Sequence, residues 1–174
     1  MKYPVTLALS VAMLSGCAML SPSASIATAD LNPTQGNTAS GTTTFVKQGD
    51  KVLIDARISG LKPGLHGFHI HEKGDCSAPD GASAGGHFNP SGADHGDPAA
   101  AKHHGGDLGN LMADAGGNAV LNTTISMHGI SFASTGADSI AGRGLIIHAD
   151  ADDFMTQPTG NSGKRVACGV ITLR

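Results

Sequence analysis

The chain has 174 residues, which is enough for one domain with a sizeable core and too few for two. Its formal net charge is -3 and it has only 11 lysines and arginines, so nothing suggests the basic patches of nucleic-acid-binding proteins, and we expect no nucleic-acid partner. There are 25 glycines, 5 phenylalanines and no tryptophan, so the core must be built from Val, Ile, Leu and Ala, a composition that suits short strands joined by many turns.

Residues 1–17 have the pattern of an export signal. Lys2 precedes an apolar run over residues 5–14 that is too short to span a bilayer. The sequence Leu-Ser-Gly-Cys at residues 14–17 resembles the lipobox of bacterial lipoproteins, in which the signal is cut before the cysteine and that cysteine carries the lipid. Ordinary cleavage after residues 27–29, Ala-Thr-Ala, is the alternative.

The number of cysteines favours the lipoprotein interpretation. An exported chain with three cysteines that forms one disulfide keeps one odd thiol, and lipidation of Cys17 removes it. We therefore expect a signal peptide over residues 1–17, a short tether over 18–23 and one domain over 24–174. The protein would reside in the periplasm or cell envelope and would contact the membrane only through its lipid anchor.

Short apolar or alternating segments separated by Gly- and Pro-rich turns run along the rest of the chain. Val52, Ile54, Ala56 and Ile58 alternate with polar residues, which is typical of a half-buried strand. Two long stretches without periodicity, 72–110 and 149–164, indicate functional loops held by something other than packing. The sequence predicts an all-β fold, a Greek-key antiparallel β-sandwich or flattened barrel of about eight strands. The predicted strands cover residues 25–31, 42–48, 52–59, 66–71, 111–113, 119–125, 144–148 and 166–173.

Histidines provide the chemical signal of the sequence, because seven of the nine lie within residues 66–107. His69 and His71 are two residues apart on a predicted strand, so both imidazoles project from the same face and can converge on one ion. Nitrogen ligands suit copper and zinc, and a mixed His/Asp set without thiolate suits zinc. The further candidate ligands are His87, His95, His104, Asp107 and, at the end of a separate buried strand, His148.

Four sequence blocks then carry a resemblance. They are GFHIHE at residues 67–72, GHFNP at 86–90, HGGDLGN at 104–110 and GNSGKRVACGVI at 160–171. Together they resemble the signature blocks of copper/zinc superoxide dismutases. The resemblance implies dismutation of superoxide to dioxygen and hydrogen peroxide by a redox-cycling copper, bridged through His87 to a structural zinc.

The resemblance also implies roles for individual residues. Arg165 would dock the superoxide anion, and the bridging His87 would carry a proton. Asp152 would link one ligand of each metal, for which Asp153 is the less well spaced alternative, and Cys76 and Cys168 would form a disulfide. The implied copper ligands are His69, His71, His87 and His148, and the implied zinc ligands are His87, His95, His104 and Asp107.

Three histidines receive no metal in this interpretation. The resemblance makes His66 a residue that forms structural hydrogen bonds beneath the site. His103 is expected to be a loop residue, because the spacing to Asp107 selects its neighbour His104. His128 has no partner nearby in the sequence and is expected to be exposed.

Other interpretations are a copper-binding or copper-delivery protein of the same fold, a zinc hydrolase and a structural zinc domain. The retained four-histidine copper set and Arg165 argue against the first and the last, and the complete zinc shell argues against the second. The short loop 149–164, the insertion around residues 76–86 and the lipobox resemble the bacterial branch of the family. A homodimer is one candidate assembly, and no aromatic stripe marks its interface.

Overall fold

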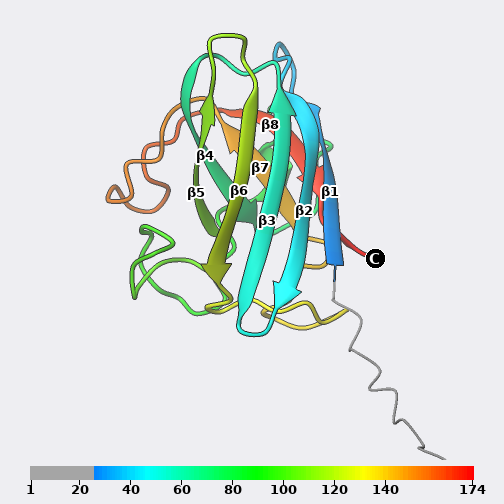
Figure 1. Ribbon diagram of the computed structural model, residues 1–174, viewed down its shortest axis with the longest axis vertical. Helices are drawn as coiled ribbons and strands as arrows, with labels where there is room; N and C mark the ends of the chain where they lie inside the picture. The colour runs from blue at the N-terminus through cyan, green and yellow to red at the C-terminus, as the bar shows by residue number, and fades with distance from the viewer. Residues whose placement is uncertain (1–25) are drawn as a thin grey trace, which may run out of the picture.

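The computed structural model describes residues 26–174, so Cys17, the expected signal peptide and the tether lie outside the described residues. Within that range the chain is all-β, with one short 3-10 turn, η1 (Ala82–Ala84) (Figure 1). No helix among residues 26–174 is long and apolar enough to cross a membrane. The strands are β1 (Ile26–Pro33), β2 (Ser40–Gln48), β3 (Lys51–Ser59), β4 (Gly64–His71), β5 (Asp107–Ala113), β6 (Ala119–Ser126), β7 (Gly144–His148), β8 (Arg165–Val170) and β9 (Thr172–Leu173).

The strands form one antiparallel sheet that closes on itself. Their order is β2-β3-β6-β5-β4-β7-β8-β1-β9, and a further pairing of β1 with β2 joins the first eight strands into a barrel. β4 lies between β5 and β7, so neighbours in the barrel are not all neighbours in the sequence. The predicted antiparallel Greek-key barrel with two long loops is confirmed, with the two-residue β9 as an extra strand.

Alternation of side chains explains why β3 lies where it does. Val52, Ile54, Ala56 and Ile58 are buried in the core, while the residues between them are exposed or half-buried. Gly49 has a φ of 67°, which suits glycine in the tight turn from β2 to β3. Burial of these side chains fixes the register of the strand, because a shift of one residue would turn all four toward water.

Most strand boundaries lie within two residues of the prediction, and two differences are larger. β5 begins at Asp107 rather than at residue 111, because Asp107 pairs with His69 across a register irregularity in β4. The glycine before it, Gly106, is typical of a loop and gave no sign of a strand. Only glycine fits at this position, since a Cβ atom would lie 2.4 Å from the carbonyl oxygen of Ile70. The last predicted strand is divided at Ile171, whose amide donates to the carbonyl of Arg143.

The two long loops lie on the same side of the barrel, beside β4 and β5 (Figure 1). They contact each other through Gln157, which accepts from the amide of His95 and donates to its carbonyl. The two loops, β4 and the end of β7 therefore enclose one region of the molecule, and the candidate ligands lie there.

Candidate metal centre

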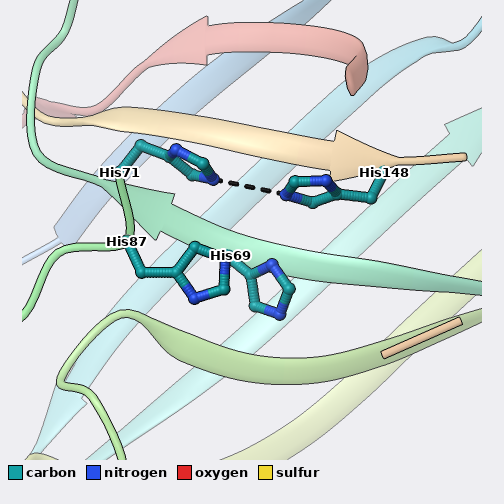
Figure 2. A group of neighbouring side chains, drawn as sticks. All are labelled: His69, His71, His87 and His148. Atoms are coloured by element: carbon teal, nitrogen blue, oxygen red, sulfur yellow. Dashed lines mark hydrogen bonds between the residues drawn. The ribbon is translucent and has the colours of Figure 1, made fainter. Parts of the chain in front are cut away.

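Two neighbouring strands place three of the candidate histidines. His69 and His71 lie on β4, and His148 ends β7, which pairs with β4 through His69–Ile146 and His71–Gly144. His87 lies in the long loop and forms an isolated bridge with His71. Their side chains gather in one cluster, with one ligand atom of each within 4.8 Å of the others (Figure 2).

The first cluster holds two imidazole nitrogens in an arrangement that requires a cation or a shared proton. His71 Nδ1 donates to the carbonyl of Gly85 at 2.9 Å, and His148 Nδ1 donates to that of Gly163 at 3.1 Å. Since a carbonyl oxygen only accepts, each neutral ring keeps a lone pair on Nε2. These two Nε2 atoms lie 3.3 Å apart (Figure 2), so their lone pairs converge on a common point.

The second cluster is built around the carboxylate of Asp107. Its Oδ2 atom accepts the amides of Gly96 and His104, at 3.1 and 2.9 Å. Its Oδ1 atom lies within 3.4 Å of ring nitrogens from His87, His95 and His104. Three imidazoles and one fixed carboxylate oxygen form the donor set that tetrahedral zinc prefers. The four members are His87, His95, His104 and Asp107, again with ligand atoms within 4.8 Å of one another.

His87 belongs to both clusters. Its Nδ1 atom lies 3.1 Å from Asp107 Oδ1, on the side of the second cluster. Its Nε2 atom is buried without a hydrogen-bond partner, on the side of the first cluster. One imidazole therefore offers a nitrogen to each of two ion sites.

Buried nitrogens without partners show that metals fit these clusters. Of the five buried side-chain polar atoms without a hydrogen bond in residues 26–174, three are His69 Nδ1, His87 Nε2 and His95 Nδ1. His95 Nδ1 lies 3.0 Å from Asp107 Oδ1 but lacks the geometry of a hydrogen bond. Buried polar groups are nearly always bonded, so three such nitrogens in one place fit the binding of cations. Copper suits the all-nitrogen cluster and zinc suits the cluster with the carboxylate.

The pKa values of the protein groups also favour cation binding. Burial lowers the pKa of His87 to about 4 and that of His148 to about 3, and it lowers the pKa of His71 well below its usual value. These imidazoles are therefore neutral at pH 7, as ligands must be. Burial alone would raise the pKa of Asp107, but its contacts with His104, His87 and His95 lower it, so the carboxylate stays ionised.

Asp152 connects the two clusters from the outside. Its Oδ2 atom accepts from His69 Nε2 at 2.8 Å, and its Oδ1 atom accepts from His95 Nε2 at 2.9 Å. Both Nε2 protons are thereby held away from the clusters, so Nδ1 is the ring atom that can bind a metal in each case. Asp153 lies at the surface and bonds Thr156 instead. Although burial would lower the pKa of His95, its contacts with Asp107 and Asp152 raise it to about 9.

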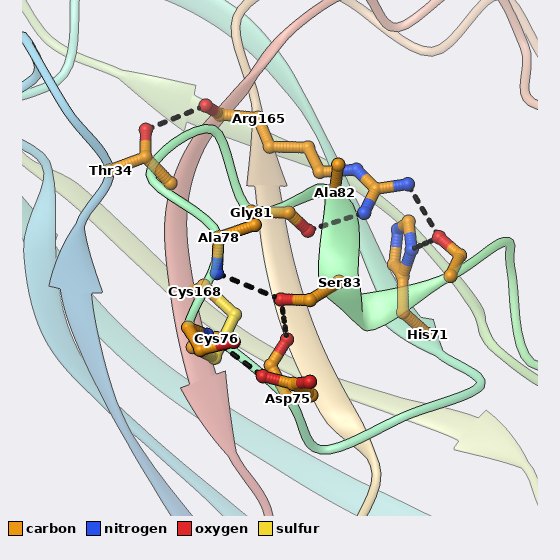
Figure 3. Close-up of a disulfide and its surroundings, with 12 residues drawn as sticks. Thr34, His71, Asp75, Cys76, Ala78, Gly81, Ala82, Ser83, Arg165 and Cys168 are labelled. Atoms are coloured by element: carbon orange, nitrogen blue, oxygen red, sulfur yellow. Dashed lines mark hydrogen bonds between the residues drawn. A yellow bond between two sulfur atoms is a disulfide. The ribbon is translucent and has the colours of Figure 1, made fainter.

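Arg165 lies beside the first cluster at the start of β8. Its guanidinium donates to the carbonyls of Gly81 and Gly85, and the carbonyl of Gly85 also accepts from His71 (Figure 3). The predicted disulfide between Cys76 and Cys168 is confirmed, with Cα atoms 5.8 Å apart. It ties the segment that carries both carbonyls to β8, the strand that carries Arg165 (Figure 3).

The remaining histidines lie outside the two clusters. His66 uses both ring nitrogens, toward the carbonyls of His148 and Lys62, each at 2.8 Å. His103 is a loop residue as expected, but it is buried. His128 is exposed as expected, and its ring lies next to that of His103, with the ring centroids 5.5 Å apart.

Three positions that orient the site were not predicted. The carbonyls of Gly85 and Gly163 fix the rings of His71 and His148, and Asn110 bonds both backbone polar groups of Asp152. Every residue has a carbonyl, so the sequence carries no signal for the first two. Asn110 lies within the conspicuous block at residues 104–110, which could have marked it.

Comparison with known proteins agrees with this geometry. Residues 39–171 match the family model described as copper/zinc superoxide dismutase. Superoxide dismutase [Cu-Zn] 2 from Brassica juncea is 42% identical over 151 residues, covering 83% of this chain and 95% of that protein. The crystal structure of the clock protein EA4 is similar with a TM-score of 0.75 and 41% sequence identity, covering 86% of this chain and 94% of that one. The two clusters, their shared histidine and these matches together show that the chain belongs to the copper/zinc superoxide dismutase family.

Proposed function

We propose that this protein catalyses the dismutation of superoxide, in which two superoxide anions and two protons give dioxygen and hydrogen peroxide. The observation that carries the proposal is the position of His87, which offers one nitrogen to an all-histidine cluster and the other to a cluster that contains a carboxylate. A site for a redox metal thus lies next to a site for a metal that never changes its oxidation state.

In this proposal His69, His71, His87 and His148 hold copper, and His87, His95, His104 and Asp107 hold zinc. When bound, copper supplies the one-electron couple that oxidises one superoxide and reduces the next. The chain itself keeps the ring protons away from the ion sites, through the carbonyls of Gly85 and Gly163 and the carboxylate of Asp152.

Arg165 would position the anion. Its guanidinium is held by two backbone carbonyls rather than by a carboxylate, so its charge is not neutralised by a direct ion pair. It shares the carbonyl of Gly85 with His71, which places the cation next to the first cluster. A planar, permanently charged group in this place would bind a small anion and orient it.

His87 would supply a proton to the product. Its Nε2 atom has no hydrogen-bond partner among the described residues, and the side chain is only 1% exposed. A proton taken up at this nitrogen would be close to the bound anion and could leave with hydrogen peroxide. The second proton would come from solvent.

The substitution His148→Ala tests this proposal. The variant should lose copper and superoxide decay but keep zinc, because His148 belongs to the first cluster alone. Metal content by mass spectrometry and the decay of superoxide by pulse radiolysis provide the two measurements. Normal decay in the variant would overturn the copper assignment. A fully loaded parent protein without activity would favour the alternative of copper delivery.

We further propose that the protein is an exported bacterial lipoprotein of the periplasm or cell envelope, anchored through Cys17. The apolar run and Leu-Ser-Gly-Cys at residues 14–17 support it, as does the Cys76–Cys168 disulfide, since disulfides persist mainly outside the cytosol. The variant Cys17→Ser should appear in the soluble fraction and should no longer incorporate labelled fatty acid. Membrane association that persists in this variant would refute the anchor.

The proposal includes a homodimer. Leu65 and Met112 are cross-strand partners on β4 and β5, and both are exposed, at 43% and 62%. Val120 on β6 is 66% exposed. It lies near Met112, because the adjacent residues Ala119 and Ala113 are cross-strand partners on β6 and β5. A row of exposed apolar side chains across three strands suits a self-association surface. Sedimentation analysis should find a dimer that Met112→Glu dissociates.

A further inference from the structure

Two histidines remain after the metal centre is accounted for. Of the nine in the chain, six belong to the two clusters, and His66 has both ring nitrogens engaged with backbone carbonyls. The remaining pair is His103, in the loop that carries the second cluster, and His128, just after β6. They are 25 residues apart by numbering, yet their rings lie next to each other.

The distance between these two rings is that of histidines that can share a metal ion. The ring centroids of His103 and His128 are 5.5 Å apart. Within the clusters, the centroids of His71 and His148 are 5.4 Å apart, and those of His87 and His104 are 5.5 Å apart. Aromatic rings that only pack lie about 4.5–7 Å apart as well, so the spacing permits a shared ion, and the choice between the two depends on the tautomer and on the space around the rings.

The tautomer of His103 is set in the way that metal ligation requires. Its Nδ1 atom donates to the carbonyl of His104 at 2.7 Å, so the neutral ring keeps its lone pair on Nε2. Metal-binding histidines usually donate their other nitrogen to a carbonyl or carboxylate in this manner. The histidines of the first cluster follow the same pattern through Gly85 and Gly163.

The pair also has room for an ion. Both histidines line a cavity of about 440 Å³ that further includes Lys51, Thr124 and Ser126. His128 is exposed, so an ion could reach the pair from solvent. Water or the neighbouring hydroxyl groups could complete the coordination.

Tight packing holds the two histidines in place. A Cβ atom on Gly105 would lie 2.8 Å from Ile130 Cγ2 and 3.1 Å from the carbonyl oxygen of Gly129. The backbone after His103 is therefore pressed against the backbone after His128. Figure 1 shows the green loop before β5 beside the end of β6.

We propose that His103 and His128 form a third metal site, separate from the buried centre, which binds divalent first-row transition metals and Cu(II) most strongly. Two imidazoles with otherwise weak ligands favour Cu(II) over Zn(II), as the general affinity order of divalent ions dictates. The site has only two strong protein ligands and lies near the positive charge of Lys51, so it binds its ion more weakly than either buried cluster.

Occupation of this site has a structural consequence. The ion would join the loop that carries His95 and His104 to the connection between β6 and β7. A ligand that binds only the folded protein stabilises it, so Cu(II) should raise the melting temperature and slow amide exchange around residues 98–104 and 127–130. This effect does not depend on superoxide dismutation.

The test adds Cu(II) to the full chain whose buried clusters already hold copper and zinc, so that the added ion has no stronger site to enter, and its spectrum is obtained by subtracting that of the starting protein. The protein should bind one equivalent of Cu(II) without release of zinc, and its electron paramagnetic resonance spectrum should show two nitrogen ligands. The affinity should fall about tenfold or more in His128→Ala and in His103→Gln. The control Lys47→Ala, which changes an exposed lysine outside the cavity, should bind as the parent does.

The variants distinguish this site from adventitious binding. His128 is exposed, so its removal does not endanger folding, and a normal melting temperature of the copper-free variant verifies this. Lys51→Glu should strengthen binding, because it replaces a repelling charge with an attracting one. Cu(II) affinity that is equal in the parent and in His128→Ala, or one nitrogen or none in the spectrum, would overturn the proposal. Zinc content, measured first, reports separately on the buried centre.

Discussion

Asn110 and Asp152 are joined by a reciprocal pair of hydrogen bonds. Asn110 Nδ2 donates to the carbonyl of Asp152 at 2.9 Å, and the amide of Asp152 donates to Asn110 Oδ1 at 2.8 Å. Asn110 lies on β5, whereas Asp152 lies in the loop after β7. The strand thus fixes the loop residue that orients His69 and His95, one from each cluster.

We expect Asn110→Ala to weaken zinc binding by about 10- to 100-fold, the usual effect of removing a group that supports a metal ligand. The reason is that Asp152 would lose both backbone anchors and hold His95 less firmly. Competition with a zinc chelator measures the affinity. Asn122→Ala removes an exposed asparagine whose side chain donates to Asp55, away from the metal centre, and it should leave zinc affinity unchanged. Equal affinities in both variants would mean that β5 does not orient the site.

Arg165→Gln should slow superoxide decay by about 10- to 100-fold, within the range that electrostatic attraction contributes to association rates. The guanidinium bonds the carbonyls of Gly81 and Gly85 and no side chain of either cluster, so copper and zinc contents should stay at parent levels. Pulse radiolysis at low salt measures the rate, and titration with azide measures anion affinity, which should fall in parallel. Arg57→Gln serves as control, since Arg57 is a surface residue paired with Asp55. A loss of metal in Arg165→Gln would contradict the docking role.

The sequence predicted β7, which is buried throughout, from an apolar run, and it predicted other strands from alternation between buried and exposed residues. Val52 to Ile58 is such a strand, and its interpretation needed only the period of two. The start of β5 escaped prediction because residues 107–110 do not alternate between buried and exposed, and because Gly105 and Gly106 directly before them are typical of a loop. These glycines are needed by close approaches of Ile70 and Ile130, and those neighbours are distant in the sequence.

The site could be predicted only as far as its side chains are chemically distinctive. Histidines at short spacings and the signature blocks pointed to all members of both clusters. The contact of His103 with His128 was not predictable, since it depends on how the long loop folds against the end of β6. The role of the Gly85 carbonyl, which accepts from both His71 and Arg165, was not predictable either, because every residue has a carbonyl.

The stability of the metal-stripped protein should depend on pH with a maximum near neutrality. Burial lowers the folded pKa of His87 to about 4 and of His148 to about 3, below the unfolded value of about 6.5. Their contribution is complete above pH 6.5 and is lost as the pH falls toward 3. The folded pKa of His95 is raised to about 9, so its contribution is complete below pH 6.5 and is lost as the pH rises to 9.

Melting temperatures between pH 3 and pH 10 measure this dependence, and the zinc-loaded protein is the control. Zinc would occupy Nδ1 of His95, so the folded protein would no longer bind the extra proton and the decline above pH 6.5 should disappear. A stripped protein whose melting temperature is constant from pH 6.5 to 9 would show that His95 carries no proton there. The acid decline should persist in His95→Gln.

The disulfide should contribute to both stability and activity. It joins residues 92 positions apart, and closing a loop of that size lowers the entropy of the unfolded chain by an amount worth about 4–5 kcal/mol. The double variant Cys76→Ser and Cys168→Ser should therefore unfold at a lower denaturant concentration.

The same variant should also affect Arg165. The segment with the carbonyls of Gly81 and Gly85 would no longer be tied to β8, so the guanidinium would lose its fixed position. Superoxide decay should then slow while copper and zinc contents, measured below the unfolding transition, stay at parent levels. If the rate per copper equals that of the parent, the disulfide stabilises the fold without positioning the arginine. The unfolding free energy, from denaturant titration of both proteins with equal metal content, separates the two contributions.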